Sequence, residues 1–511
     1  MFDVAVIGAG MAGMATAARL QARGLRTIVF EAHGQPGGCA GFFRQRGFAF
    51  DVGATTLVDF EPGGVGGELL EELGLSLEGE LLPGYRTWLP DRTVTLHRDV
   101  EPWREERLRQ LGSTPAHLRF WRLLDRLANV FWSASRAGIK LPFRRPVDVL
   151  HAARCIPLTG LPLARHLNWT MGDALRAHGL RDDAPLCALL AMLIEDTVHA
   201  TLDTAPLINA ALGITIRGAG LTRARGGMAG FWRRFTERYR QLGGVLRVGC
   251  AVTRVSGAEG DFVVHTRRGD FAAAQVVSAL PLSLTARLAP EPVTRVVRPF
   301  LQRDADALGG ALVVFLGVPE DEVAGEDFTH HQLLHDYAAP LGDGNNMFIS
   351  VSAPGDTESA PTGFRAVMLS THCELAPWQG LSTEDYESRK REAENKLISL
   401  ARRVYPTLGQ RAVIRETGTP VTYQRYTHRP LGAVGGVRQR LTNSNQHAVP
   451  HDIGVPGFWL AGDSMWPGLG TVACVLGSRI VAKGALRRAH AADAPLPTPR
   501  ELKSPLSVSR R

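Results

Sequence analysis

The glycines at positions 8, 10 and 13 have the spacing of a dinucleotide-binding turn. In such a turn the first glycine permits the tight bend, the second lets the backbone approach a pyrophosphate, and the third lets a helix pack closely on a strand. The apolar residues 3–7 predict a buried strand before Gly8, and the alanine-rich and leucine-rich residues 11–23 predict a helix after it. Gly8, Gly10 and Gly13 would therefore place a helix N-terminus against phosphate charge, which that end of a helix stabilises.

Glu31 ends a second apolar stretch, residues 27–30, and lies where a ribose-binding acid is expected. A carboxylate at this strand end accepts hydrogen bonds from both hydroxyls of an adenosine ribose and disfavours a 2′-phosphate. Together with the glycine turn, Glu31 predicts a strand, helix, strand unit that binds the ADP half of a dinucleotide. FAD and NAD both contain that half, so this unit alone does not separate them.

Three further segments point to FAD. Residues 37–42, 47–57 and 459–464 resemble the amine oxidase and phytoene desaturase superfamily of FAD enzymes, in which the chain returns near its end to cover the flavin. The resemblance implies that Asp463 hydrogen-bonds the ribityl and pyrophosphate region and that a helix beginning near Gly470 directs its N-terminus at the flavin. This is physically consistent, because a reduced flavin gathers negative charge that a helix N-terminus stabilises.

The cofactor-binding residues expected from the motifs and the resemblance come from several separate parts of the chain. They are Gly8, Gly10, Met11, Ala12, Gly13, Glu31, Ala32, Gly37, Gly38, Cys39, Ala54, Thr55, Val252, Gly462, Asp463, Gly470, Thr471 and Val472.

Other motifs resemble a narrower group, the bacterial carotenoid desaturases and isomerases. They are residues 36–40, 50–55, 61–64, 350–356, 419–420, 425–429 and 434–436. Within that group the pattern is most similar to the cyanobacterial-type C-3′,4′ carotenoid desaturases, and the similarity extends to about residue 485. Many relatives have arginine where Cys39 stands, which leaves one phosphate contact unassigned.

The resemblance implies an FAD-dependent oxidoreductase of carotenoid biosynthesis that desaturates a long apolar polyene by hydride transfer to flavin N5. Two alternatives stay open: a carotenoid cis-trans isomerase that uses reduced FAD without net redox change, and a non-enzymatic FAD-containing lipid-binding protein. A conjugated polyene delocalises positive charge, so the protein need not supply a strong acid or base. No catalytic side chain is assigned from the sequence.

A second complete dinucleotide motif is missing from the sequence. Residues 218–223 have glycines at the first two positions of the motif but lack the third. Flavoproteins that depend on NAD(P)H commonly carry a second nucleotide domain, so the expected electron acceptor is oxygen or a quinone, unless the substrate itself fills that role.

His330, His331 and His335, with Asp336, raise the possibility of a metal site, because histidines four residues apart share one face of a helix. The surrounding residues 329–337 have the pattern of a strand instead, in which such residues lie too far apart to chelate one ion. We therefore expect histidines that line a cavity wall or lie at the surface, and no metal.

The segment 127–169 combines six basic residues with aromatic and aliphatic ones, among them Trp132, Phe143 and Leu158. This composition is typical of a segment that rests on anionic lipid. An arginine-rich helical cap with an ordinary apolar core side is the alternative. Since a carotenoid must leave a bilayer, the resemblance favours a peripheral membrane protein on the inner face of the membrane, otherwise cytoplasmic.

The 511 residues, 44% hydrophobic and 21% charged, predict a large globular protein with two or three structural units. The predicted fold class is α/β. A Rossmann-like FAD-binding domain is expected from residues 1–84, 220–290 and 426–485, and a mixed α/β substrate domain from 85–219 and 291–425. Residues 486–511 form a basic tail, expected to be disordered, that contributes half of the net charge of +8. Nucleic-acid binding is not expected, because the basic residues form no recognisable binding module.

Overall fold

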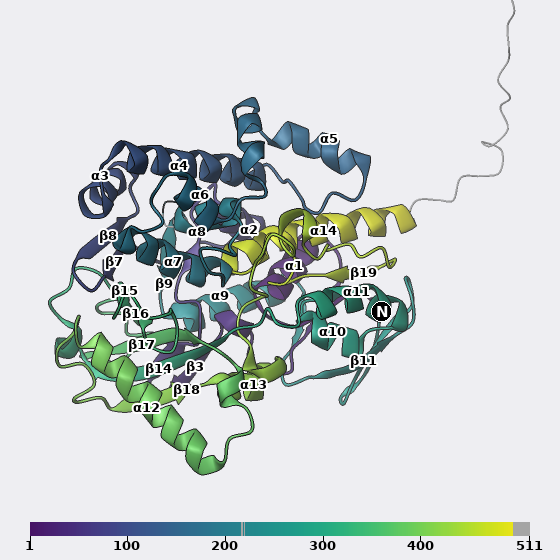
Figure 1. Cartoon of the computed structure of the whole chain (residues 1–511). Helices are drawn as coiled ribbons and strands as arrows, with labels where there is room; N and C mark the ends of the chain where they lie inside the picture. The colour runs from purple at the N-terminus through teal and green to yellow at the C-terminus, as the bar shows by residue number, and fades with distance from the viewer. Residues whose placement is uncertain (216–217, 219, 494–511) are drawn as a thin grey trace, which may run out of the picture.

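The computed structural model describes residues 1–215, 218 and 220–493. Two seven-stranded sheets form the frame, and helices surround both of them (Figure 1). Ala219, within the incomplete glycine motif, lies outside the described residues, and so do residues 494–511 of the expected tail.

The first sheet has the strand order β10-β2-β1-β13-β12-β11, with β19 paired to β13. Its strands are β1 Phe2–Ile7, β2 Thr27–Phe30, β10 Val245–Arg247, β11 Val252–Ser256, β12 Phe262–Thr266, β13 Gly269–Ser278 and β19 Phe458–Leu460. Strands β10, β2, β1, β13 and β19 are parallel, and β2 and most of β1 are buried, as expected for a sheet covered on both faces. Three distant parts of the chain therefore share one sheet.

Helix α1, Met11–Ala22, connects β1 to β2 and packs against α2, Val65–Leu73, and the C-terminal α14, Thr471–Asp493. Residues 11–20 of α1 are all buried. They include Arg19, whose guanidinium pairs with Glu72 and donates to Ser478 Oγ at 3.3 Å. These partners are needed because an unpaired buried charge is costly.

Helix α14 continues beyond the point where the sequence predicted disorder. Residues 486–493 belong to this helix, so a disordered tail from residue 486 is wrong for that stretch. Leu486 packs against the hydrophobic core and Arg488 forms an ion pair with Glu259, which gives the last turns tertiary contacts.

The second sheet has the order β18-β14-β17-β16-β15-β7-β8. Its strands are β7 Gly84–Trp88, β8 Thr93–His97, β14 Gly310–Pro319, β15 His330–Leu334, β16 Asn346–Val351, β17 Phe364–Cys373 and β18 Ile414–Gly418. Side chains of β14 alternate between two clusters: Leu312 and Val314 pack beneath helix α12, Thr383–Ala401, whereas Val313 and Phe315 point to the opposite face. That opposite face is the one that meets the cavity described below.

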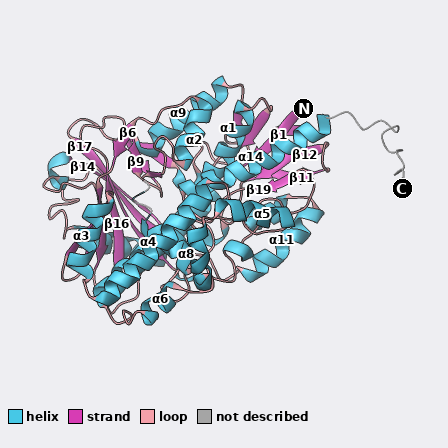
Figure 2. Cartoon of the chain, turned by 90° about the horizontal axis from the view of Figure 1, so that it is seen from above, coloured by secondary structure: helices cyan, strands magenta, loops and turns pink. Residues whose placement is uncertain are grey.

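The chain between β8 and β9 forms a group of helices. Helices α3, α4, α6 and α8 of this group lie together on one side of the molecule (Figure 2). The group consists of α3 Val100–Leu111, α4 Pro115–Arg136, α5 Pro146–Cys155, the 3₁₀ segment η2 Leu158–His166, α6 Met171–Ala177, α7 Ala184–Val198 and α8 Leu207–Thr215. Among the residues that the structure describes, no helix has both the length and the apolar character needed to cross a bilayer.

Shorter elements complete the fold. They are β3 Phe42–Gln45, β4 Phe48–Asp51, β5 Leu57–Val58, β6 Gly79–Leu81, β9 Leu221–Ala224, α9 Gly227–Gln241, α10 Leu282–Leu288, α11 Glu291–Arg303, α13 Pro420–Thr427, η1 Gly38–Ala40, η4 Glu320–Val323, η5 Ala376–Trp378, η6 Pro430–Gly432 and η7 Asn445–His447.

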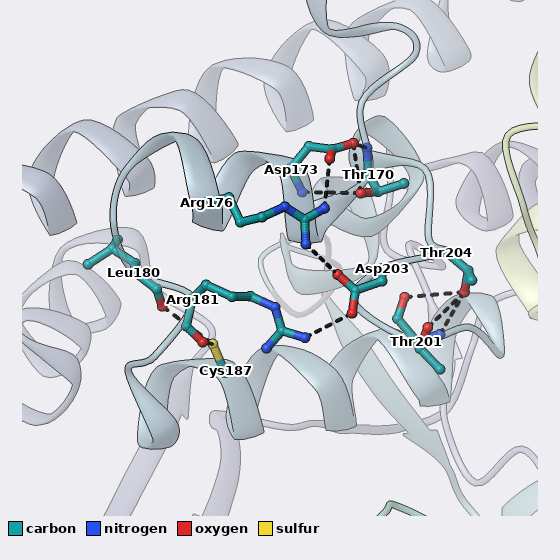
Figure 3. A network of polar contacts seen from close by, with 9 residues as sticks. All are labelled: Thr170, Asp173, Arg176, Leu180, Arg181, Cys187, Thr201, Asp203 and Thr204. Carbon is teal, nitrogen blue, oxygen red and sulfur yellow. Dashed lines mark hydrogen bonds and ion pairs between the residues drawn. The ribbon is translucent and has the colours of Figure 1, made fainter.

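A polar network ties the loop after α7 to the neighbouring helices (Figure 3). Asp203 accepts hydrogen bonds from Arg176 at 2.9 Å and from Arg181 at 2.8 Å. Thr170 and Asp173 cap α6 reciprocally, with backbone to side-chain distances of 2.9 and 3.1 Å. The network ties the loop at residues 199–206 to α6 and to Arg181 before α7.

The predicted α/β fold class, a Rossmann-like sheet from three chain segments beside a mixed α/β part, is confirmed. The apolar stretches 311–315 and 347–351 lie in β14 and β16, as predicted. The exact domain limits stay a prediction.

Candidate functional site

A cavity of about 1080 Å³ is lined by residues from both sheets. Ile7 and Phe30 come from the first sheet, and Val313, Phe315 and Met368 from the second. Small-molecule sites usually occupy roughly 300–1,000 Å³. The volume lies slightly above the upper end of that range.

The glycine turn lies at one part of the cavity wall. Gly8 has φ +102° and Gly10 precedes the first turn of α1 without any side-chain cap among the described residues. The first backbone N–H groups of a helix have no partner within the helix, and a bound anion satisfies them. Gly13 does not line the cavity: a Cβ there would lie 2.0 Å from the Gly8 carbonyl oxygen, so glycine permits α1 to pack on this turn.

Glu31 follows β2 and lines the cavity near this turn. Its Oε2 accepts the backbone N–H of Ala9 at 2.8 Å, and its Oε1 accepts that of His33 at 2.8 Å. Each carboxylate oxygen keeps a second lone pair that can accept a hydroxyl proton. The two hydrogen bonds therefore orient the Glu31 carboxylate so that it can accept hydrogen bonds from ribose hydroxyls.

Asp463 lies on the cavity wall and pairs with Arg429, whose Nη2 is 2.6 Å from Asp463 Oδ2. Burial alone would lower the pKa of Arg429, but the Asp463 carboxylate raises it above the ordinary value. Cys39, half-buried in η1, lines the same cavity. Arg429 thus brings positive charge to the cavity wall beside Asp463.

Most of the predicted cofactor residues line this one cavity. Gly8, Gly10, Met11, Ala12, Glu31, Ala32, Gly37, Gly38, Cys39, Ala54, Thr55, Val252, Gly462, Asp463, Gly470 and Thr471 do so. Val472 does not, because its side chain packs into the hydrophobic core beneath α14. Their roles in binding stay predictions, but the structure brings them together as one surface.

The rest of the cavity wall is largely apolar. Phe42, Phe43, Val52, Tyr85, Met192, Leu221, Ala311, Val313, Phe315, Met347, Phe348 and Met368 contribute to it. Such a wall suits a hydrocarbon, since burial of apolar surface is favourable without any specific hydrogen bond.

A polar cluster interrupts this apolar wall. Asp196 and His199 come from the end of α7, Asn346 from β16 and His372 from β17. The His372 Nε2 is 3.6 Å from Asp196 Oδ1, and its ring meets that of His199 edge to face at 4.8 Å between centroids. Asn346 donates to Glu195 Oε2 at 2.6 Å. The sequence analysis did not predict this cluster. The available signal was the acidic pair Glu195 and Asp196, which directly follows the apolar residues 187–194 of α7.

The histidines at 330 and 331 lie on strand β15, as predicted, but both are buried and neither lines the cavity, so the expected position at a cavity wall or at the surface is wrong for them. His330 Nε2 lies 3.1 Å from Ser350 Oγ, and His331 Nε2 lies 2.9 Å from the Tyr405 hydroxyl. His335 is exposed beyond the strand end. Within the described part of the chain no group of three or more histidine, cysteine or acidic side chains is arranged to hold a metal ion.

The geometry is that of a dinucleotide-binding protein. The uncapped N-terminus of α1, the glycine turn before it and the Glu31 carboxylate all lie at one cavity. A model of the family described as flavin containing amine oxidoreductase matches residues 11–484, and the chain belongs to that family. The predicted FAD cofactor and enzyme class are thereby confirmed. The uncapped N-terminus of α1, Glu31 and the Asp463 region fit FAD.

Curated relatives agree with the predicted resemblance. Prolycopene isomerase of Daucus carota is 26% identical over 92% of this chain and 78% of its own length. The 4,4′-diapolycopene oxygenase of Methylomonas sp. is 26% identical over 94% and 97%, and the lycopene-forming phytoene desaturase of Paracoccus sp. is 24% identical over 93% and 95%. The resemblance to carotenoid desaturases and isomerases is confirmed at this level.

Solved structures agree with the fold. A putrescine oxidase double mutant covers 96% of this chain and 99% of its own with a TM-score of 0.63 at 15% identity. Cyclohexylamine oxidase from Brevibacterium oxydans IH-35A covers 96% and 100% with a TM-score of 0.60 at 17% identity.

Replacing Glu31 with glutamine should weaken FAD binding about tenfold or more. The neutral amide loses charge-assisted hydrogen bonds to the ribose, worth about 1–3 kcal/mol. Quenching of flavin fluorescence on titration into the apoprotein measures the affinity, and Glu105→Gln, at an exposed position of α3, is the matched control. Equal affinities for the wild type and Glu31→Gln would show that this carboxylate does not hold the ribose.

Proposed function

We propose that the protein is an FAD-dependent desaturase of a long apolar polyene, a carotenoid. The observation that carries this proposal is a single cavity that joins the dinucleotide-binding turn to a wall of aromatic and aliphatic side chains. The curated relatives that act on carotenoids, and the motifs at 350–356 and 419–436, support the choice of substrate and of desaturation.

In the proposed reaction the bound flavin supplies the hydride acceptor, at N5, and oxygen or a quinone reoxidises it. The chain has to hold the polyene and exclude water from it. Phe43, Phe315, Phe348 and Met368 supply apolar surface to the cavity wall for this purpose.

An isomerase is the second candidate function. Prolycopene isomerases are among the relatives that cover more than nine tenths of this chain, with identities similar to those of the desaturases. The same cavity would accommodate a cis polyene, and reduced FAD would act there without net redox change.

Expression in cells that make lycopene or its precursors tests the proposed substrate class. Extracted pigments should have a longer conjugated system than those of cells carrying the empty vector. Unchanged pigments in all these hosts would contradict a carotenoid substrate.

We also propose that the protein binds the inner face of a membrane peripherally through residues 144–167, called here the α5–η2 segment. Val147, Val149 and Leu150 of α5 and Leu161 and Leu167 are 52–65% exposed. The exposed residues Arg144, Arg145, Arg154 and Arg165 lie in the same segment. Exposed aliphatic side chains beside arginines favour insertion at an anionic lipid surface.

The side chains that make this surface differ from those that the sequence emphasised. Trp132 and Phe143 are half-buried and pack against core clusters, because the apolar faces of their segments turn inward. The side chain of Leu158 lies outside the described residues. The exposed aliphatic residues of the α5–η2 segment take their place.

The wild type should sediment with anionic liposomes, and high salt should remove only part of the binding. Screening weakens the arginine contribution, whereas burial of aliphatic side chains persists in salt. Arg144→Glu with Arg145→Glu should lose the salt-sensitive part. Val149→Ser with Leu150→Ser should weaken the salt-resistant part at least about tenfold, since each such side chain contributes roughly 1.5–3 kcal/mol when fully buried.

Val413→Ser is the matched control, because Val413 is an exposed aliphatic residue in a different part of the chain. If the two double variants bind as well as this control, the α5–η2 segment is not the membrane contact. A wild type that stays in solution at low salt would contradict membrane binding altogether.

A further inference from the structure

We propose that His199 is a catalytic residue that accepts, at Nε2, the proton leaving the polyene during desaturation, and that His372 is the residue that positions and tunes it. This inference rests on the proposed function and adds to it the proton acceptor that the sequence did not reveal.

The backbone at His199 directs its side chain into the cavity. The residue ends α7 in the left-handed region, at φ +52°, and its N–H donates to the Glu195 carbonyl at 3.1 Å. Residues other than glycine adopt this conformation uncommonly, and such positions concentrate at functional sites. The Asp203 network described above holds the loop that follows (Figure 3).

A glycine on the facing segment makes room for the imidazole. A Cβ on Gly435 would lie 2.4 Å from His199 Cε1, so any other residue would displace the ring. The adjacent Gly436 packs in the same way on Asp463, whose carbonyl oxygen would be 2.1 Å from a Cβ there. Gly435, which packs on His199, is therefore adjacent in the chain to Gly436, which packs on Asp463, the residue predicted to contact the flavin.

The His199 imidazole is free to take a proton. Neither ring nitrogen has a hydrogen-bond partner among the described residues, and Nδ1 is fully occluded, which leaves Nε2 for the contents of the cavity. Three other histidines line the cavity. His33 lies beside the ribose acceptor Glu31 and His428 is exposed. His372 belongs to the same polar cluster as His199, and its Nε2 lies 3.6 Å from Asp196 Oδ1.

The pKa of His372, next to this ring, is raised above its ordinary value. Burial opposes protonation, but the acidic groups of Glu195 and Asp196 outweigh it. Burial also raises the pKa of Glu195 itself. Asp196 is itself held by the Gln332 amide, and Glu195 by Asn346. The cluster thus has two acidic side chains at its base and the His372 imidazole edge-on to His199.

His199 is correspondingly neutral. Burial first, and then the positive charges of His372 on β17 and of Arg438 and Arg429 on the segment after α13, hold the pKa of His199 well below its ordinary value of 6.5. From α7 itself, Glu195 and Asp196 face His372. A neutral imidazole with a free lone pair is the form that accepts a proton at physiological pH.

The proposed step balances as follows. One C–H bond of the polyene breaks and its hydrogen leaves with both electrons to FAD. The C–H bond on the neighbouring carbon then breaks, its electron pair forms the new C=C bond, and its proton goes to His199 Nε2. The acidic side chains of Asp196 and Glu195 lie in the same cluster, on the side of His372. A positioned base of this kind contributes about 10²–10⁴-fold to a rate.

The central test is His199→Asn in the FAD-loaded protein. Asparagine tolerates the left-handed backbone better than other residues except glycine, so the fold should be retained, but its amide accepts no proton at neutral pH. We expect kcat for polyene desaturation to fall at least 100-fold while KM and the affinity for FAD stay within about twofold. His335→Asn, at the exposed end of β15, is the matched control and should retain the wild-type rate.

A second variant tests whether His372 sets the pKa of His199 or has only a structural role. The wild-type rate should be constant from neutral pH down to below 6.5 and fall as His199 becomes protonated. His372→Gln removes the neighbouring charge, so the pKa of His199 should rise and this acid limb should move up by about 1 pH unit or more. NMR titration of the His199 Cε1–H in the FAD-loaded protein should report the same shift without any turnover.

The results separate the role of His199, the role of His372 and the proposed function. A His199→Asn variant that turns over at the wild-type rate, or one that changes only KM, would overturn the inference while the proposed function stands. An unmoved His199 titration in His372→Gln would overturn the role of His372. A wild type that desaturates no polyene would contradict the proposed function, and the inference would fall with it.

Discussion

A Gly13→Ala variant is expected to lose most of its affinity for FAD, at least about tenfold. The added Cβ would lie 2.0 Å from the carbonyl oxygen of Gly8 and 3.0 Å from the Cβ of Ala279. The nearest atom belongs to the backbone of the glycine turn, so relief requires α1 to move away from β1. That movement displaces the helix N-terminus from the pyrophosphate position, and overpacking of this kind typically costs 1–3 kcal/mol of stability as well.

Gly34→Ala provides the matched control for this prediction. Gly34 follows β2 in the same N-terminal unit, has an ordinary φ, and has no atom within 4 Å of an added Cβ. Flavin content after purification and the affinity of the apoprotein for FAD measure the difference between the two variants. If Gly13→Ala binds FAD as tightly as Gly34→Ala, then close packing of α1 on the turn is not what forms the site.

The cofactor half of the site was predictable because its physics is local. Gly8, Gly10 and Glu31 lie within one strand, helix, strand unit, so their spacing in sequence fixes their spacing in space. Asp463 was found from a motif at the end of the chain, since β19 returns to the first sheet beside β13. The return of the chain follows from the resemblance and not from any periodicity.

The polar cluster was not predictable in the same way. His199 ends a helix, His372 lies on a strand of the second sheet, and Gly435 follows α13, so no local pattern relates them. Their contact depends on how β17, the end of α7 and the segment after α13 pack together at one cavity. Sequence patterns likewise could not tell which apolar side chains of the α5–η2 segment face outward, because short amphipathic stretches do not fix the orientation of their faces.

Under anaerobic conditions, substrate alone should bleach the flavin absorbance band at about 450 nm. A desaturase gains two electrons on its flavin for each double bond formed, and without an acceptor the flavin stays reduced. Readmitting oxygen or a quinone should restore the band, and repeated cycles should lengthen the chromophore of the polyene. The effect is large, since the oxidised absorbance should fall nearly to zero at one equivalent of substrate.

An isomerase would behave in the opposite way, and the same apparatus distinguishes the two. It should leave oxidised flavin unbleached, require reduction of the flavin beforehand, and return a product of unchanged mass. Anaerobic product analysis with pre-reduced FAD and a cis polyene is therefore the decisive arm. Conversion of the cis polyene to its trans isomer, with no longer chromophore formed in any redox state, would replace desaturation by isomerisation as the function of this cavity. It would also remove the need for a proton acceptor at His199, so the His199→Asn variant should then isomerise the polyene at an undiminished rate.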